Sequence, residues 1–188
     1  YTVNEDIGSL PYHQSNSTCT NVTVTAGNQA TCTITNTRDT GTIELKKVWS
    51  GIGGQTTLNI GTTAGAGNID TQLTGTAGAA PLTTGQNTVN TGTYYLSETT
   101  LPNYKTAIAC TDDNAPVTLG ADNSVALAKN HNIVCTFTNT YNMGLLTVNK
   151  NVDADGDGKI DVYGATNWTW DMASGEQNIA TGQNRNLI

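Results

Sequence analysis

The sequence predicts an all-β fold made of tandem antiparallel β-sandwich domains of immunoglobulin-like type, with a half-domain at each end of the chain. Three observations predict this fold. Short runs alternate between apolar and polar residues, which is typical of strands with one buried face. Turn-forming segments such as GIGG, TAGAAP and LPNY separate these runs, and no convincing helical period is present. Only 12% of the residues are charged, and Thr, Asn and Gly dominate, as on the surface of a β-rich protein.

The domain organisation follows from an internal repeat. CTITNTRDTG at 32–41 returns as CTFTNTYNMG at 135–144, and GTIELKKV at 41–48 returns as GLLTVNKN at 144–151, each time 103 residues later. Upstream of these segments, YTVNE at 1–5 corresponds to YYLSE at 94–98. A repeat of this length has the size of a small domain. We therefore expect the C-terminal half of one domain at 1–40, a complete domain at 41–143 and the N-terminal half of another at 144–188.

The charge and the residue types exclude several classes of function. A net charge of −7 with only eight Lys and Arg residues argues against binding to nucleic acid or to an anionic membrane. No stretch approaches the roughly 20 apolar residues that span a bilayer. His13 and His131 have no Ser, Cys or carboxylate at a spacing typical of a catalytic triad, and we expect both at the surface. The sequence therefore predicts that the protein is not an enzyme.

The four cysteines predict two disulfide bonds. Cys19 with Cys32, and Cys110 with Cys135, occupy the same place in the two copies of the repeat. One disulfide in each copy is therefore expected. Even pairing in a chain of this composition is typical of an oxidising compartment, and it predicts an extracellular, cell-surface location.

Three predicted strands of the middle domain end their inward-facing row on a polar side chain. The row of Ile43 and Leu45 continues with Lys47, that of YYLSE ends on Glu98, and that of CTFTN ends on Asn139. Burial of an ammonium, a carboxylate and an amide is costly unless the three groups satisfy or consume one another.

With these residues the middle domain resembles the prealbumin-like (SpaA or collagen-adhesin B-type) domains of bacterial pilins and surface adhesins. The opening strand GTIELKKV, the E-box YYLSETTLPNY and the closing strand CTFTNT carry the resemblance. It implies that Lys47 attacks the side-chain amide of Asn139, expels ammonia and leaves an isopeptide bond, while Glu98 acts as the proton shuttle of this autocatalytic step. An apolar site favours a neutral amine, which such an attack needs. The alternative is a buried salt bridge and hydrogen-bond cluster without a covalent bond.

The repeat extends this hypothesis to the two half-domains. Lys150 is the repeat equivalent of Lys47, and Glu5 and Asn36 are the equivalents of Glu98 and Asn139. Residues 144–188 and 1–40 together make up almost one domain, which the chain cuts at a loop. We therefore expect an isopeptide bond between neighbouring copies or repeats that joins Lys150 to Asn36 beside Glu5.

A calcium site is predicted in the last segment, at DADGDGKID. Asp153, Asp155, Asp157 and Asp161 stand at positions 1, 3, 5 and 9 of a calcium-binding loop, and the Lys159 carbonyl stands at position 7. Gly158 stands at the position of the sharp turn. Position 12 is Gly164 in place of the usual glutamate, so a further oxygen is needed from elsewhere. The alternative is a solvated acidic turn.

Together these features predict a structural subunit or repeat of an extracellular bacterial filament, pilus or adhesin stalk. Intradomain covalent bonds stabilise it, and its partners are neighbouring copies of itself in head-to-tail order. Either a long tandem array or the exchange of half-domains between subunits satisfies the repeat. The alternative function is an adhesin or carbohydrate-binding module, in which Trp168 and Trp170 form a platform for a host or glycan ligand.

Overall fold

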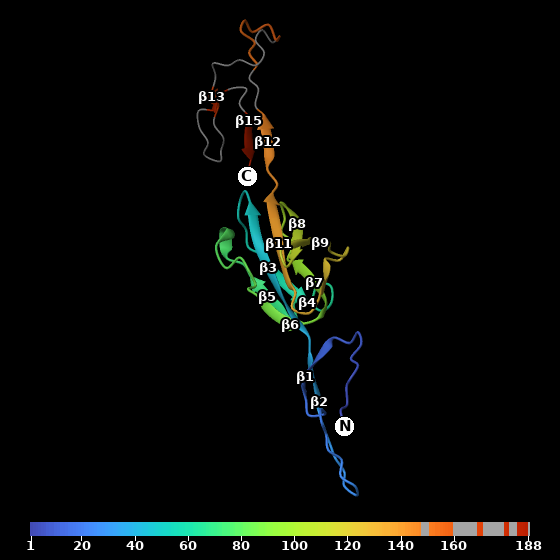
Figure 1. Ribbon diagram of the computed structural model, residues 1–188. Helices are drawn as coiled ribbons and strands as arrows, with labels where there is room; N and C mark the ends of the chain where they lie inside the picture. Colours follow the sequence, from blue (N-terminus) through green and yellow to red (C-terminus); the bar gives the residue numbers. More distant parts are fainter. Residues whose placement is uncertain (148–150, 160–168, 171–178, 181–183, 188) are drawn as a thin grey trace. The chain divides into compact units, whose positions relative to one another are not determined.

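The computed structural model describes residues 1–147, 151–159, 169–170, 179–180 and 184–187 (Figure 1). The chain divides into two compact units, Tyr1–Tyr141 and Asn142–Ile188. Regular structure in the described residues is β-strand, apart from one 3-10 turn at Thr76–Gly78. This confirms the predicted all-β class. No helix in these residues is long and apolar enough to cross a membrane.

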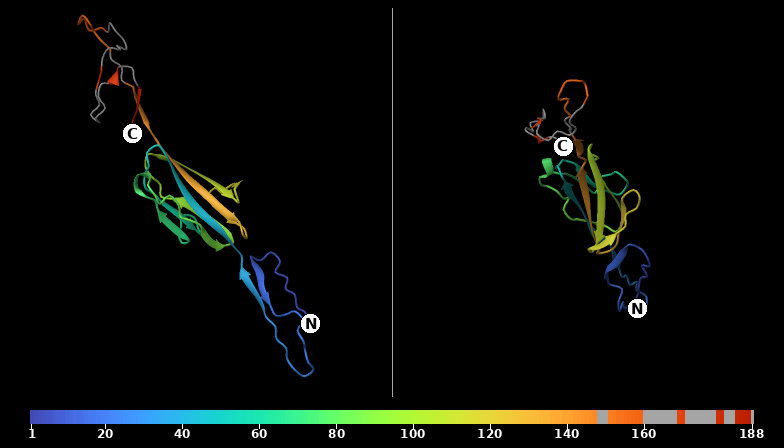
Figure 2. Two further views of the ribbon diagram at one scale, coloured as in Figure 1. Left: turned by 60° about the vertical axis from the view of Figure 1, so that its left-hand side comes forward. Right: turned by 90° about the horizontal axis from the view of Figure 1, so that it is seen from above.

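The middle part of the first unit is a sandwich of two sheets that face each other (Figure 2). The five-stranded sheet contains, in spatial order, β6 (Asn87–Asn90), β3 (Thr40–Ser50), β11 (Asn132–Tyr141), β8 (Tyr104–Asp112) and β9 (Ala115–Val117). The four-stranded sheet contains β10 (Ser124–Leu127), β7 (Gly92–Glu98), β4 (Thr57–Gly61) and β5 (Asp70–Leu73).

One strand pair departs from the antiparallel arrangement expected of the sandwich. β3 and β11 run parallel, in a continuous register from Thr42 beside Asn132 to Ser50 beside Thr140. Figure 1 shows the two arrows side by side and pointing the same way. Parallel neighbours need a long connection, and here the other strands of the sandwich supply it. The domain therefore begins and ends on adjacent strands of one sheet.

The core lies between the two sheets and is built from the alternating rows that the sequence predicts. Ile43 and Leu45 of β3 are fully buried, as are Leu58 and Ile60 of β4. The other large members of the cluster are Tyr94, Leu96, Val125, Leu127, Ile133 and Phe137. Burial of each such side chain contributes roughly 1.5–3 kcal/mol. Truncation of Leu45 to alanine would cost about 2–5 kcal/mol, because a cavity is added to the lost burial.

The first 38 residues form a smaller structure, called the N-terminal hairpin below. In it β1 (Tyr12–Ser17) and β2 (Ile34–Arg38) pair antiparallel. These strands are the repeat equivalents of β8 and β11. The preceding segment differs from its equivalent in burial. Tyr1 is 83% exposed and Val3 is 52% exposed, whereas the equivalent side chains of β7, Tyr94 and Leu96, are 5% and 1% exposed. Apolar side chains that form core in one copy therefore face solvent in the other.

Asp39 connects β2 to β3 and is held from both sides. His13 of β1 contributes Nδ1 at 2.6 Å from Asp39 Oδ1, and Lys129 of the middle domain donates to the same oxygen at 2.9 Å. The backbone N–H of Asp39 donates to Pro11 O at 3.0 Å. These contacts tie the N-terminal hairpin to the sandwich.

The second unit contains two short antiparallel pairs in its described residues. β12 (Gly144–Thr147) pairs with β15 (Asn184–Leu187), and β13 (Thr169–Trp170) pairs with β14 (Ile179–Ala180). In the middle domain the equivalents of β12 and β15, which are β3 and β6, also pair antiparallel. The repeat in sequence is thus accompanied by a repeat in strand pairing.

Candidate functional site

Lys47 and Glu98 form a buried pair between the two sheets of the sandwich. Alternation along β3 turns Lys47 inward, and Glu98 ends the inward row of β7 on the facing sheet. Lys47 Nζ donates to Glu98 Oε2 at 2.8 Å, and the two side chains are 0% and 4% exposed. Burial lowers the pKa of Lys47 and the hydrogen bond to Glu98 opposes this effect, with a net lowering. A lowered pKa makes the neutral amine more accessible.

Asn139 is fully buried on β11 and only partly hydrogen-bonded. Its Oδ1 accepts a hydrogen bond from Thr106 Oγ1 at 2.9 Å, but its Nδ2 has no partner in the described structure. Lys47 Nζ also lies 3.5 Å from the carbonyl oxygen of Phe137, two residues before Asn139. A buried amide N–H without a partner costs about 1–3 kcal/mol. The structure therefore brings the three predicted side chains to one site and leaves the amide nitrogen of Asn139 unpaired.

Thr106 is a member of this site that the sequence reasoning missed. It lies directly opposite Asn139 across the antiparallel β8–β11 pair. Its Oγ1 is 3.0 Å from Glu98 Oε1 as well as 2.9 Å from Asn139 Oδ1. No local motif marks this threonine in a Thr-rich chain, because only the register of β8 against β11 reveals its position.

Aromatic rings cover the lysine. Lys47 Nζ lies over the Trp49 ring, 4.6 Å from its centroid. Trp49 and Tyr104 meet edge to face with centroids 5.4 Å apart, and Tyr104 meets Tyr141 in the same way at 5.1 Å. The Lys47 side chain is 0% exposed, and the low dielectric of such a buried site strengthens electrostatic interactions within it.

Both predicted disulfides are present. Cys110 and Cys135 are direct neighbours across β8 and β11, with Cα atoms 4.0 Å apart. Cys19 and Cys32 form the second bond, with a Cα separation of 4.9 Å. Cys135 points into the same core as Phe137 and Asn139, so the disulfide and the buried polar cluster share one strand.

The structure also brings together two of the three residues expected to form the second cross-link. Asn36 Nδ2 donates to Glu5 Oε1 at 2.8 Å, at the exposed surface of the N-terminal hairpin. Gln14 stands opposite Asn36 in the register, where the middle domain has Thr106 opposite Asn139. Lys150 lies outside the described residues.

The predicted calcium loop is partly described. Ligand oxygens of Asp153, Asp155 and Asp157 lie within 4.8 Å of one another. The backbone N–H groups of Gly158 and Gly156 donate to Asp153 at 2.9 and 2.7 Å, and these bonds hold the pKa of its carboxyl below the usual value. Lys159 Nζ lies 3.0 Å from Asp157. Asp161 lies outside the described residues. Oxygen ligands on a tight loop with two left-handed glycines suit calcium.

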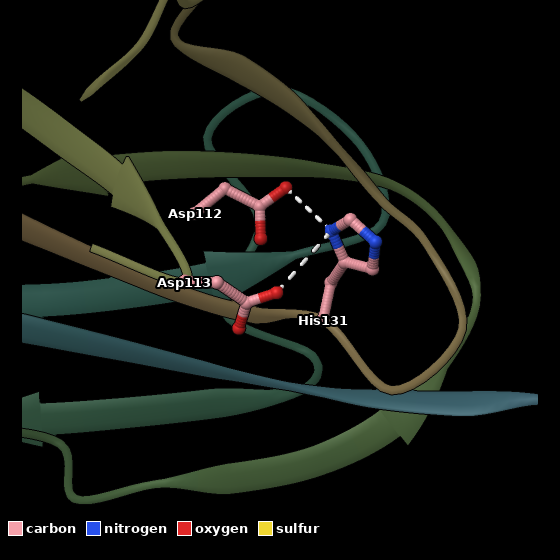
Figure 3. Close-up of side chains that lie close together, drawn as sticks. All are labelled: Asp112, Asp113 and His131. Atoms are coloured by element: carbon pink, nitrogen blue, oxygen red, sulfur yellow. Dashed lines mark hydrogen bonds and ion pairs between the residues drawn. The ribbon is translucent and has the colours of Figure 1, made fainter. Parts of the chain in front are cut away.

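Two histidines expected to stand alone at the surface in fact contact carboxylates. His13 meets Asp39, as described above. His131 Nδ1 lies 2.7 Å from Asp112 Oδ2 and 3.8 Å from Asp113 Oδ2 (Figure 3). The hydrogen bond to Asp112 raises the pKa of His131. Both side chains are well exposed, at 44% and 43%, as expected of surface residues. The carboxylate contacts were not predicted, because each partner is distant in sequence, across the domain junction for His13 and across the β8–β11 pair for His131.

The two tryptophans predicted to form a ligand platform belong to the second unit. Trp168 lies outside the described residues, and Trp170 is in β13.

Comparison with known proteins identifies the family. A family model described as a prealbumin-like fold domain matches residues 43–141, and a second model of the same description matches residues 2–38. The first match covers more than half of the chain. The chain therefore belongs to the prealbumin-like fold domain family, as its resemblance predicts.

Solved structures similar to this chain include a Streptococcus pyogenes protein. The crystal structure of that organism's major pilin shares 17% identity, covers 64% of this chain and 54% of its own, and gives a TM-score of 0.35. A glutamate-to-alanine mutant and an asparagine-to-alanine mutant of that pilin, also at 17% identity, give TM-scores of 0.33 and 0.34. Each covers 57% of this chain and 50% of the mutant chain. This chain thus spans about half the length of these pilins. No curated protein matches it.

Proposed function

We propose that this chain is a structural subunit or repeat of an extracellular bacterial filament, pilus or adhesin stalk. The observation that carries the proposal is the buried Lys47–Glu98–Asn139 site inside a prealbumin-like sandwich. The prealbumin-like family match and the two disulfides support it. A bond between β3 and β11 would join the first and last strands of the domain. The chain acts on no separate substrate in this proposal, and its chemistry is confined to its own cross-links.

The central element of the proposal is an isopeptide bond between Lys47 and Asn139. Three features support it. The pKa of Lys47 is lowered, the Glu98 carboxyl lies at hydrogen-bond distance from Lys47 Nζ, and Asn139 Nδ2 makes no hydrogen bond that its release would break. Simple retention of the buried ion pair would leave the unpaired Nδ2 unexplained. Release of ammonia removes that group from the core.

Intact mass of the native chain tests the bond. Each isopeptide lowers the mass by about 17 Da and each disulfide by about 2 Da, through loss of ammonia and of two hydrogens. After reduction of the disulfides, the isopeptide deficit should remain, and peptide mapping should place it on Lys47 and Asn139. A reduced chain at its full sequence mass would reject the covalent bond and favour the hydrogen-bonded cluster.

The filament part of the proposal rests on the exposed apolar residues of the N-terminal hairpin. Tyr1 and Val3 are exposed where their repeat equivalents are core. In the middle domain, the first half of the domain packs on the equivalent residues, Tyr94 and Leu96. By the repeat, that first half corresponds to residues 144–188. We propose that this segment of a neighbouring copy or repeat covers residues 1–40 and places Lys150 beside Glu5 and Asn36. The order of copies is then head to tail.

A calcium ion bound by Asp153, Asp155, Asp157, the Lys159 carbonyl and Asp161 is the third part of the proposal. The convergence of the three described carboxylates supports it. Like charges this close repel one another unless a cation or hydrogen bonds compensate. The loop would then stabilise the second unit only.

A further inference from the structure

The Thr106 hydroxyl lies between two oxygen atoms but has only one hydrogen to donate. Its hydroxyl lies within 3.0 Å of two oxygens, Glu98 Oε1 and Asn139 Oδ1. A hydroxyl carries one hydrogen and can donate to one acceptor at a time. The amide oxygen of Asn139 carries no hydrogen, whereas a carboxyl oxygen can. The hydroxyl therefore donates to one of the two oxygens at a time, and both contacts are hydrogen bonds at once only in a step in which the carboxyl holds a proton and donates it to Thr106.

The lysine is placed to give the carboxyl a proton when the reaction begins. Lys47 Nζ lies 2.8 Å from the other carboxyl oxygen, Glu98 Oε2, and neither side chain is appreciably exposed. Transfer of a proton from the ammonium to the carboxylate removes two buried charges. The neutral amine can still donate to Oε2. Every contact then has one hydrogen, in a chain that runs from Nζ through Glu98 and Thr106 to Asn139 Oδ1.

We propose that the Thr106 hydroxyl is a catalytic group that relays a proton from Glu98 to the amide oxygen of Asn139 during isopeptide formation. This inference rests on the proposed cross-link. The relay polarises the amide carbonyl, which makes its carbon more susceptible to the amine. Asn139 Nδ2, with no hydrogen-bond partner, stays free to leave.

The reaction balances with these groups alone. The Nζ lone pair attacks Cγ of Asn139, Oδ1 takes the Thr106 hydrogen, and Thr106 takes the Glu98 proton. The Glu98 carboxylate then removes a proton from Nζ and delivers it to Nδ2. When the carbonyl re-forms, the Oδ1 hydrogen returns through Thr106 to Glu98. The Cγ–Nδ2 bond breaks, its electrons leave with nitrogen, and ammonia is released.

The N-terminal hairpin provides an internal contrast. Gln14 occupies the place of Thr106, and Asn36 Nδ2 there donates directly to Glu5. The hydroxyl relay is thus a feature of the middle domain and is not required by the strand pairing itself.

Two substitutions at position 106 separate the hydroxyl from the shape of the side chain. Thr106→Val keeps the branched shape and removes the hydroxyl, whereas Thr106→Ser keeps the hydroxyl and removes the methyl group. Thr138→Val is the matched control, because Thr138 precedes Asn139 on the opposite face of β11. The full-length chain is made by cell-free synthesis, and the loss of about 17 Da is followed over time by intact mass.

We expect Thr106→Val to form the bond about 10²–10⁴-fold more slowly, which is the range that a positioned proton transfer contributes. Thr106→Ser and the control should keep rates close to that of the unmodified chain. Equal rates for Thr106→Val and the unmodified chain would overturn the relay and leave the cross-link intact. So would a Thr106→Ser chain as slow as Thr106→Val, because shape would then be the cause. An unmodified chain that never loses ammonia would instead reject the cross-link itself.

Circular dichroism of each variant reports whether it folds. If Thr106→Val does not fold, Thr106→Ala removes the hydroxyl without added bulk and serves in the same comparison, with the same outcomes.

Discussion

Glu98 contacts two different groups with its two oxygens, Lys47 on one side and Thr106 on the other. Its removal therefore affects both the nucleophile and the amide. A carboxyl in this position can remove a proton from the amine and return it to the leaving group. At the scale of a single residue, the proposed cross-linking of the middle domain depends most on this side chain.

Glu98→Ala should give a chain that folds but retains the side-chain amide of Asn139, so that its intact mass shows no loss of ammonia. The proposed proton shuttle is absent, and the buried lysine loses the carboxylate that it contacts among the described residues. The measurement is intact mass after reduction of the disulfides. Glu44→Ala is the control, because Glu44 lies on the outward face of β3, the strand of Lys47, and contacts Thr83 and Lys46. Glu98→Gln, which keeps the shape, should behave like Glu98→Ala. A mass deficit of about 17 Da in either Glu98 variant would contradict the shuttle.

The ion pair of His131 with Asp112 should make the stability of the folded chain depend on pH. The hydrogen bond of His131 to Asp112 raises the folded pKa above the ordinary value for histidine. A raised pKa favours the protonated histidine in the folded state. The stability it contributes is therefore complete below the unfolded pKa, and it is lost as pH rises through the higher folded pKa. The melting temperature of His131→Gln should fall below that of the unmodified chain in mild acid, and the difference should vanish in alkaline buffer. A difference that is constant with pH would contradict this origin.

The residues that the sequence could and could not locate differ in a simple physical way. Alternation along one strand depends only on the period of the pleat, so Lys47, Glu98 and Asn139 could be placed inward from their own segments. Thr106 and Asp112 depend on register between strands that are distant in the chain. The parallel pairing of β3 with β11 depends on the whole topology, and no local pattern encodes it. The residues outside the described ranges, among them Lys150 and Asp161, stay predictions.

At the scale of elements, β11 is cross-linked to β8 through Cys110 and Cys135. The loop that this disulfide closes spans 25 residues. Closing a loop of that length contributes about 3–4 kcal/mol by restricting the unfolded chain. The sandwich is too small for a generous core, so this contribution is a large part of its net stability.

Replacement of Cys110 and Cys135 together by alanine should destabilise the middle domain by roughly 3 kcal/mol or more. The lost loop constraint and the cavity in the core both contribute. Denaturant unfolding measures the change. The same double replacement at Cys19 and Cys32 is the control, because it leaves the middle domain's own disulfide in place. Equal unfolding midpoints for the unmodified chain and the Cys110/Cys135 variant would contradict the prediction.

If the loop of Asp153, Asp155 and Asp157 binds calcium, the ion should stabilise only the second unit. Chelation should lower the melting temperature of the second unit and leave that of the middle domain unchanged, because binding to the folded state alone stabilises only what it contacts. Calorimetry in calcium and in chelator measures both transitions. Asp153→Asn should weaken the response, since Asp153 lies at the centre of the loop's hydrogen bonds. An equal response of both units, or none, would count against a specific site.

At the scale of the whole molecule, the proposal concerns how copies associate. The N-terminal hairpin exposes apolar side chains, and such surfaces are usually covered by a partner. If residues 144–188 of a neighbour cover it, Lys150 meets Glu5 and Asn36. The chain should then form oligomers joined by covalent bonds that survive denaturation and reduction.

Denaturing gels of purified chain should show a ladder of oligomers that Asn36→Ala abolishes. The Lys47–Asn139 bond, detected by mass, should be unaffected and serves as the control. Tyr1→Ser should weaken association without removing the chemistry, because it reduces the apolar surface. A closed monomer in which residues 1–40 and 144–188 of one chain pack together would refute the filament and favour the binding module.

The parallel pairing of β3 and β11 has a mechanical consequence. Because the first and last strands run the same way, β3 begins at one end of the sheet and β11 ends at the other. A force that pulls the chain apart at Thr40 and Tyr141 therefore slides the two strands along each other. In this shear geometry the interstrand hydrogen bonds from Thr42 to Ser50 resist together, whereas an antiparallel pair pulled at its open end breaks one bond at a time. The middle domain is built to withstand extension along its length.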